Sequence, residues 1–276
     1  MRLSVIAKVL ALPVVFFVCF FLVPLSVVLM SSLWVQNQLS FEHYLTILLD
    51  QYHWSVIWVT IKLGIYSTLI CALLGYPLAW FMIRIVSTPL WRRLLVILLI
   101  VPLFTSNIVR SFGWMVLLGR TGFINETLQN MGLIERPIRF LGTELGILIG
   151  LVYILLPFMV ISVGASISRI DRSLEYASRD LGAGHWETFR YISLPLTLPG
   201  LAAGSIMVFA LSVSAYVTPA LLSGGRVTVL PMLIYQQYST VFNFSYGGAL
   251  SIVLLLATLF LVAFANRLGS TKGGDK

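Results

Sequence analysis

The segment from residue 171 to residue 195 has the most specific pattern of residue types in the chain. A small, weakly apolar stripe recurs there at i, i+3, i+4 and i+7: Leu174, Ala177, Ser178 and Leu181. This spacing predicts a helix over 171–182, which Gly182-Ala183-Gly184 ends. Residues 186–192 can restart it, and Leu194-Pro195 turns the chain. Small side chains offer lipid little apolar area but admit another protein surface, so the stripe favours protein docking over a helix that only lies on a membrane.

A charged stripe follows the same predicted helix through Asp171, Glu175 and Arg179. A glutamate four residues before an arginine has the favoured order for a helical ion pair, which stabilises a helix by about 0.3–0.5 kcal/mol. We therefore expect Glu175 to pair with Arg179.

Few other side chains suggest chemistry. Cys19 and Cys71 lie in apolar runs, so we expect no disulfide and no metal site. His43, His53 and His185 fall in loops or at helix ends, which disfavours an intramembrane enzyme built on a histidine cluster. No G-x-x-x-x-G-K-[ST] loop occurs, so the chain is not expected to hold nucleotide in the usual way.

The elements that position these groups are long apolar segments. Hydrophobic residues make up 59% of the 276 positions and charged residues 10%, whereas about a quarter of a soluble domain is charged. A spanning helix needs about 20 mostly apolar residues. Six segments qualify: Val9–Leu33, Val56–Ile83, Leu94–Leu118, Leu145–Ser168, Leu198–Leu222 and Gly247–Asn266. The sequence thus predicts an all-α integral membrane protein, a single domain over 1–276, in which Pro13, Pro24, Pro77, Pro102 and Pro157 can kink the helices.

Basic residues predict the orientation, because short cytoplasmic loops are enriched in Lys and Arg. With the N-terminus inside, the cytoplasmic side holds most of the eighteen basic residues: Arg2, Lys8, Arg84, Arg92, Arg93, Arg169, Arg172, Arg179, Arg190, Arg267, Lys272 and Lys276. The external loop 34–55 has none, and the external loop 223–246 has only Arg226. Both termini are therefore expected in the cytoplasm, with an uncleaved first span and a cytoplasmic loop at 169–197. Because the charges are scattered, no nucleic-acid partner is expected.

The loop at 169–197 resembles a known signature. Tyr176-Ala177-Ser178, Gly182, Ile192 and Leu194-Pro195 have the spacing of the EAA loop of permease subunits in bacterial ATP-binding-cassette (ABC) importers. Tyr176 replaces the leading glutamate of that motif, and Glu175 stands one position earlier. Whether Glu175 or Tyr176 makes the central contact is open.

Further segments resemble the polyamine-type subgroup, the spermidine/putrescine permeases. They are 74–80, Val101-Pro102 with Asn107 and Arg110, 150–159 and 179–183. The resemblance implies a MetI-like bundle of six transmembrane helices in the bacterial inner membrane. It implies a permease subunit for a small organic solute, with a polyamine as the first expectation and another small organic solute as the alternative.

In that family the EAA loop is a coupling helix that docks in a cleft of a cytoplasmic ATPase. Carried over by position, the resemblance assigns this contact to Glu175, Tyr176, Ala177, Ser178, Asp180 and Gly182. It also implies two ATPase subunits that hold ATP and magnesium, a second permease chain that is expected to be homologous but different, and an extracytoplasmic solute-binding protein. The chain itself is expected to have no catalytic residues, no cofactor and no metal.

A polyamine crossing the membrane needs carboxylates or aromatic faces, since a cation–π contact is worth about 0.5–2 kcal/mol. No acidic residue falls in the central part of any predicted span. The candidates for the pathway are Asn107, Arg110, Trp114, Tyr153 and Tyr216. For the aromatic three, bundle packing or interface anchoring is the alternative; for Arg110, it is structural pairing.

Lys62 lies near the external end of its span, where we expect its ammonium group to reach water. A secondary transporter is an alternative class for the whole chain. It would need acidic residues or broken helices near the midplane, and the central spans offer no such acids.

Overall fold

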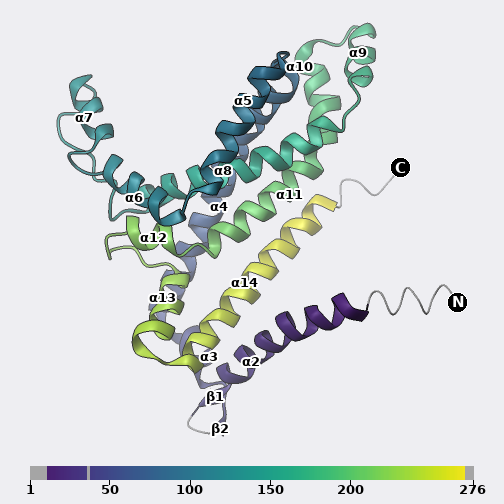
Figure 1. Ribbon diagram of the computed structural model, residues 1–276. Coiled ribbons are helices and arrows are strands. Elements are labelled where there is room, and N and C mark those ends of the chain that lie inside the picture. The colour runs from purple at the N-terminus through teal and green to yellow at the C-terminus, as the bar shows by residue number, and fades with distance from the viewer. Residues whose placement is uncertain (1–10, 36–37, 271–276) are drawn as a thin grey trace, which may run out of the picture. The chain divides into compact units, whose positions relative to one another are not determined.

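The computed structural model describes residues 11–35 and 38–270, which form mostly helices (Figure 1). The chain divides into two compact units. Unit 1 comprises Met1–Ile57 and Leu230–Leu259, and unit 2 comprises Trp58–Val229 and Phe260–Lys276. Two long helices, α4 (Gln51–Trp80) and α14 (Phe244–Ser270), pass from one unit into the other.

Unit 1 begins with the apolar helical segment Ala11–Ser32. This segment contains the π-helical turn η1 (Val18–Leu22) and α2 (Val23–Ser32). The other elements of the unit are the strands β1 (Trp34–Val35) and β2 (Gln38–Leu39), α3 (Glu42–Leu49), α13 (Leu230–Gln236) and the π-helical turn η5 (Gln237–Val241). The two strands are antiparallel, with Trp34 opposite Leu39. The Ser32 hydroxyl lies 2.6 Å from the Tyr44 hydroxyl, and this hydrogen bond joins α2 to α3.

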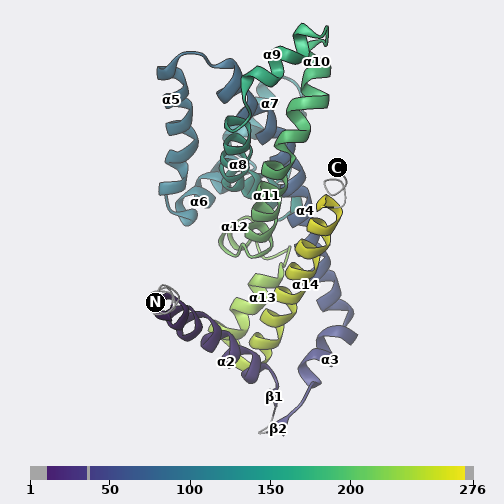
Figure 2. The same ribbon diagram turned by 90° about the vertical axis from the view of Figure 1, so that its right-hand side faces the viewer.

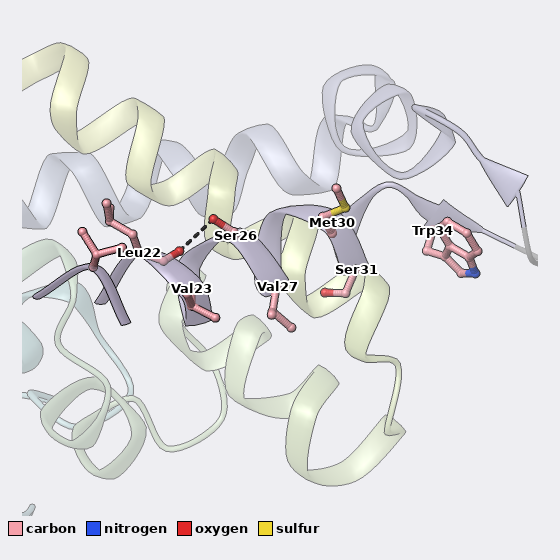
Figure 3. Close-up of a pocket in the computed structure, with 8 residues that line it drawn as sticks. Leu22, Val23, Ser26, Val27, Met30, Ser31 and Trp34 are labelled. Atoms are coloured by element: carbon pink, nitrogen blue, oxygen red, sulfur yellow. Dashed lines mark hydrogen bonds between the residues drawn. The ribbon is translucent and has the colours of Figure 1, made fainter. Parts of the chain in front are cut away.

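One side of η1 and α2 is an open apolar surface (Figure 3). A hollow of about 650 Å³ lies along it, lined by Val18, Leu22, Val23, Ser26, Val27, Met30, Ser31 and Trp34. The Ser26 hydroxyl donates to the Leu22 carbonyl at 2.7 Å, so it is satisfied within the helix. Such a surface fits lipid or another transmembrane helix.

Unit 2 holds most of the helices. They are, besides its part of α4 and the end of α14, the π-helical turn η2 (Phe81–Ile85), α5 (Pro89–Ile100), the 3₁₀ turn η3 (Val101–Phe104), α6 (Asn107–Leu117), α7 (Phe123–Asn130), α8 (Glu144–Ser168), α9 (Arg172–Asp180), α10 (His185–Thr188), the π-helical turn η4 (Phe189–Ser193), α11 (Leu194–Val213) and α12 (Val217–Leu222). Figures 1 and 2 show α9 and α10 at one end of the long helices of this unit and α6 and α12 at the other.

The core of unit 2 is built where α8 packs against α11. The two backbones come close because Gly200 and Gly204 present no side chain: a Cβ at position 200 would collide with Ser166, and one at 204 would lie 2.8 Å from the Met159 sulfur. The Ser162 hydroxyl donates to the Gly200 carbonyl at 2.8 Å across this contact. Small residues and side-chain hydrogen bonds of this kind hold helices together in membranes, where lipid removes the hydrophobic drive for association.

Among the described residues, five helices are long and apolar enough to cross a membrane: Ala11–Ser32, Gln51–Ile85, Glu144–Ser168, His185–Val213 and Phe244–Ala265. The predicted first, second, fourth and sixth spans each lie within or overlap one of these, apart from Val9 and Leu10, which fall outside the described residues. The second span is longer than predicted. A bent pair of helices supplies a sixth crossing if it is counted as one.

The predicted third span, Leu94–Leu118, is a bent pair of helices and not one straight helix. Residues Pro89–Phe104 and Asn107–Leu117 form two helical pieces bent by 102°. Thr105 and Ser106 between them have extended backbones, and Ser106 caps α6 by accepting a hydrogen bond from the Ile108 N–H. Pro102 also lacks the N–H that a continuous helix would use, so apolar length alone overestimated the helix.

The predicted fifth span, Leu198–Leu222, is wrong at both ends. A helix runs continuously through His185–Val213, and the chain leaves it at Ser214 before α12 begins. Pro219 explains the break, because its ring would clash with the carbonyl four residues earlier in an unbroken helix.

The expectation that Leu194-Pro195 turns the chain is also wrong, since both residues lie inside the continuous helix. The π-helical turn η4 precedes Pro195, and the Leu194 N–H bonds to the Phe189 carbonyl five residues back. The turn η1 stands before Pro24 in the same way, with the Val23 N–H bonded to the Val18 carbonyl. A wider turn just before proline accommodates the missing N–H, so these helices continue.

Candidate functional site

Helix α9 forms where the stripe of small residues predicted it, and it is capped at both ends. The Asp171 carboxylate accepts the Ser173 N–H at 2.9 Å, and this hydrogen bond lowers the pKa of Asp171. At the other end Gly182 adopts φ +91°, the Gly182 N–H bonds to Arg179 O and the Ala183 N–H bonds to Ser178 O. These two bonds make a Schellman motif, which requires the left-handed backbone that glycine adopts without strain.

The candidate coupling residues divide between two faces of the α9 segment. Tyr176 is 55% exposed, and Ala177, Asp180 and Gly182 are exposed as well. Ser178 is half-buried, and its hydroxyl lies 3.1 Å from the Thr188 hydroxyl of α10. These five residues therefore form an outward surface in which only Ser178 is partly covered, and we call it the α9 surface.

Glu175 lies on the opposite face of the helix and is 8% exposed. Its carboxylate pairs with Arg84 at 3.0 Å rather than with Arg179, so the predicted i,i+4 pair is wrong. The Ser193 hydroxyl also donates to Glu175 at 3.3 Å. A buried acid satisfied inside its own chain overrides the weak preference for an exposed helical pair.

The connection after α9 is short and ordered by polar contacts. Glu187 accepts the Gly184 N–H at 2.8 Å, which starts α10. Phe189 packs edge-on against Trp80 at 5.5 Å and stacks on Trp186 at 5.4 Å. These contacts hold the segment after α9 in a defined conformation, so the α9 surface is not carried by a loose loop.

Four of the five candidate pathway residues gather on α6 and α8. Asn107, Arg110 and Trp114 follow one another at helical spacing on α6, and the Trp114 ring meets Tyr153 of α8 edge-on at 5.3 Å. Arg110 donates a hydrogen bond to Asn107. The Nε and Nη1 atoms of Arg110 are buried with no hydrogen-bond partner among the described residues.

The fifth candidate, Tyr216, stands in the break between α11 and α12. Helix α12 packs against α6, and the Ser111 hydroxyl lies 3.1 Å from the Thr218 hydroxyl between them. The two broken segments of unit 2 therefore meet. Ser111 and Thr218 are both buried at this contact. Irregular backbone inside a membrane is tolerated where protein buries it.

The position of Lys62 in the sequence predicted that its ammonium group reaches water. In the structure the side chain is partly exposed and also pairs with an acid. Its ammonium group pairs with Glu144 at 2.6 Å, and the two side chains are 25% and 38% exposed. This bond ties α4 to the beginning of α8. Nothing in the residues around Lys62 pointed to this partner, because Glu144 is 82 residues away along the chain.

A third polar cluster lies in unit 1. His53 is 8% exposed, with Nδ1 2.8 Å from the Asp50 carboxylate and Nε2 2.7 Å from the Tyr246 hydroxyl. It joins the start of α4 to the start of α14. In the described part of the chain, no group of three or more His, Cys, Asp or Glu side chains could hold a metal ion, and Cys19 and Cys71 are free.

The described residues thus combine helices long enough to cross a membrane with a capped, exposed helix, α9, that lies between α8 and α11 in the chain. The chain belongs to the family described as the inner membrane component of binding-protein-dependent transport systems, which matches residues 3–269. It is a permease subunit of an ABC importer and not itself the hydrolase.

Two relatives share about four fifths of their length with it. The spermidine/putrescine transport system permease protein PotB of Haemophilus influenzae is 36% identical over 237 residues, which are 85% of this chain and 82% of that protein. PotB of Escherichia coli is 37% identical over 230 residues, which are 82% and 83% of the two chains.

The fold is also similar to that of a solved bacterial ABC transporter involved in the import of the acidic polysaccharide alginate. The TM-score is 0.82 at 20% identity, over 98% of this chain and 96% of that chain. At this identity the similarity concerns the fold alone, which is that of MetI-like ABC permeases.

Proposed function

We propose that this chain forms the membrane pathway for a polyamine such as spermidine or putrescine. The observation that carries the proposal is the 36–37% identity to two permeases named for these solutes, over more than 80% of this chain in each case. The edge-on Trp114–Tyr153 pair supports it, because aromatic faces attract ammonium groups.

The importer of this proposal has two permease chains, two ATPase subunits that hold ATP and magnesium, and an extracytoplasmic solute-binding protein. This chain has both termini in the cytoplasm and supplies one half of the pathway beside a homologous, different chain. The acids that a polyamine needs come from the partner permease or from the binding protein. Asn107, Arg110, Trp114, Tyr153 and Tyr216 lie along the route.

The α9 surface is the proposed docking site of the ATPase. Tyr176, Ala177 and Gly182 are exposed, and the two small residues admit a close approach. ATP binding closes the ATPase dimer, moves α9 and switches the bundle from inward-facing to outward-facing. Such coupling requires contacts that differ in free energy between the two states.

Docking is tested by replacing Gly182 with arginine and measuring how much ATPase copurifies with the permease. Gly132→Arg is the matched control, because Gly132 has φ +72° and a Cβ added there, like one added at Gly182, would meet no atom within 4 Å. We expect Gly182→Arg and Ala177→Arg to reduce the copurified ATPase at least tenfold and Gly132→Arg to leave it unchanged. Equal recovery from all three variants would show that the ATPase binds elsewhere.

A second candidate solute is another small organic molecule that carries a carboxylate. The buried nitrogens of Arg110, which have no hydrogen-bond partner among the described residues, favour it, because a guanidinium group prefers a carboxylate to an ammonium ion.

The solute is identified with the whole importer in liposomes. ATP hydrolysis is measured while the binding protein is loaded in turn with spermidine, putrescine and a panel of amino acids and small organic acids. Stimulation by the two polyamines and none by the acids supports the first proposal. The opposite result would replace it with the second.

A further inference from the structure

The buried side of α9 is fastened to the end of the second span by an arginine. Arg84 lies in η2, its Nη2 is 3.0 Å from the Glu175 carboxylate, and the same Nη2 donates to the Ile170 carbonyl at 3.1 Å. The two charged side chains are only 9% and 11% exposed. Because Ser193 of η4 donates to the same oxygen of Glu175, one carboxylate joins three elements.

A second link reaches the same turn. Arg172, in the first turn of α9, donates to the Ile83 carbonyl of η2 at 3.4 Å. The guanidinium group of Arg84 also lies 5.9 Å from the centroid of the Trp80 ring in the preceding turn of α4. The contacts therefore run from α9 into η2 and onward to α4.

We propose that Arg84 and Glu175 are positioning residues that transmit movement of α9 to the second span. The inference rests on the proposed function, in which the ATPase docks on the α9 surface. A buried, charge-assisted hydrogen bond is directional, and separating its partners leaves an uncompensated charge. Helix α9 therefore cannot slide freely over η2, and a push on its exposed face displaces the end of α4.

This role differs from the one that the position of Glu175 in the EAA loop implies. Glu175 acts inside the permease and does not touch the ATPase. The exposed residue next to it, Tyr176, is left to face the partner.

The test uses the whole importer in liposomes and measures three quantities: copurified ATPase, ATP hydrolysis and solute uptake. The variants are Glu175→Gln, Arg84→Gln and the double variant, which leaves no buried charge unpaired. Arg93→Gln is the matched control, because Arg93 is exposed on α5. We expect all four variants to retain ATPase, and uptake per ATP to fall at least tenfold in the three pair variants but not in the control.

Three results would overturn the proposal. Wild-type uptake per ATP in the double variant would make the pair a folding contact only. Loss of copurified ATPase in Glu175→Gln but not in Arg84→Gln would make Glu175 a direct contact. If the neutral variants do not accumulate, Glu175→Asp keeps the charge and shortens the reach, and unchanged uptake per ATP in that variant would equally overturn the proposal.

The failure of the proposed function is a separate result. A wild-type importer that takes up none of the tested solutes with ATP would refute the function before any variant is measured.

Discussion

A charged side chain on an apolar helix has to find water or a group of opposite charge. Arg84 pairs with Glu175, and Lys62 pairs with Glu144. Each acidic partner lies on a helix far away in the sequence. Among the described residues, Arg110 donates a hydrogen bond to the neutral amide of Asn107 and pairs with no acid. Arg84 and Lys62 are therefore structural ties, and Arg110 has capacity left for a further acceptor.

The Lys62–Glu144 tie can be measured with a double-mutant cycle. Because both side chains are partly exposed, we expect Lys62→Met and Glu144→Gln each to lower the free energy of unfolding by about 1 kcal/mol, with a coupling of about 0.5–1 kcal/mol between them. Chemical denaturation of the purified protein in detergent checks this. A coupling of zero would mean that each group is solvated independently, as we expected for Lys62 from the sequence, where its ammonium group reaches water.

At the scale of elements, close contact between α8 and α11 depends on residues without side chains. We expect Gly200→Ala to lower the free energy of unfolding by about 1–3 kcal/mol, because the added methyl group collides with Ser166. Gly113→Ala is the control: a Cβ at position 113 meets no atom within 4 Å, so the change should stabilise α6 by up to about 1 kcal/mol.

The measurement is the midpoint of thermal unfolding of each variant in the same detergent. The two substitutions should shift the midpoint in opposite directions. A rise of the midpoint in both variants would show that helix propensity, and not packing, decides the outcome at position 200.

The contact between the two broken segments makes a separate prediction. The Ser111 and Thr218 hydroxyls lie 3.1 Å apart, so cysteines at both positions in a chain whose Cys19 and Cys71 are replaced by alanine should form a disulfide under mild oxidation. If α6 and α12 move during transport, oxidation should reduce uptake at least tenfold and reduction should restore it. Full uptake by the oxidised protein would remove this contact from the moving part of the pathway.

At the scale of the whole molecule, the distribution of Lys and Arg sets the proposed orientation. A cysteine at Arg120, exposed between α6 and α7, should react with a membrane-impermeant thiol reagent added outside the cell. A cysteine at Leu181, which is 89% exposed after α9, should react only after the membrane is opened. The background again lacks Cys19 and Cys71, and the reversed pattern of labelling would invert the topology.

The sequence by itself determined the features that depend on neighbouring residues. Runs of about 20 apolar residues located four of the membrane-length helices, the predicted first, second, fourth and sixth, since each helix in a bilayer must satisfy its own backbone groups. The stripe of small residues and Gly182 predicted α9, because helical periodicity and C-caps act over a few positions. The spacing of the EAA-like residues also indicated the family to which the chain belongs.

Only the tertiary structure decided which distant groups meet. The Arg84 partner of Glu175, the Glu144 partner of Lys62 and the contact of Gly200 with Ser166 each join segments far apart in the chain. The sequence also did not reveal the helix breaks after Phe104 and Val213, since hydropathy averages over an interruption of two or three residues. A buried charge goes to whichever partner the packing of helices brings near, and periodicity within one helix carries no information about that partner.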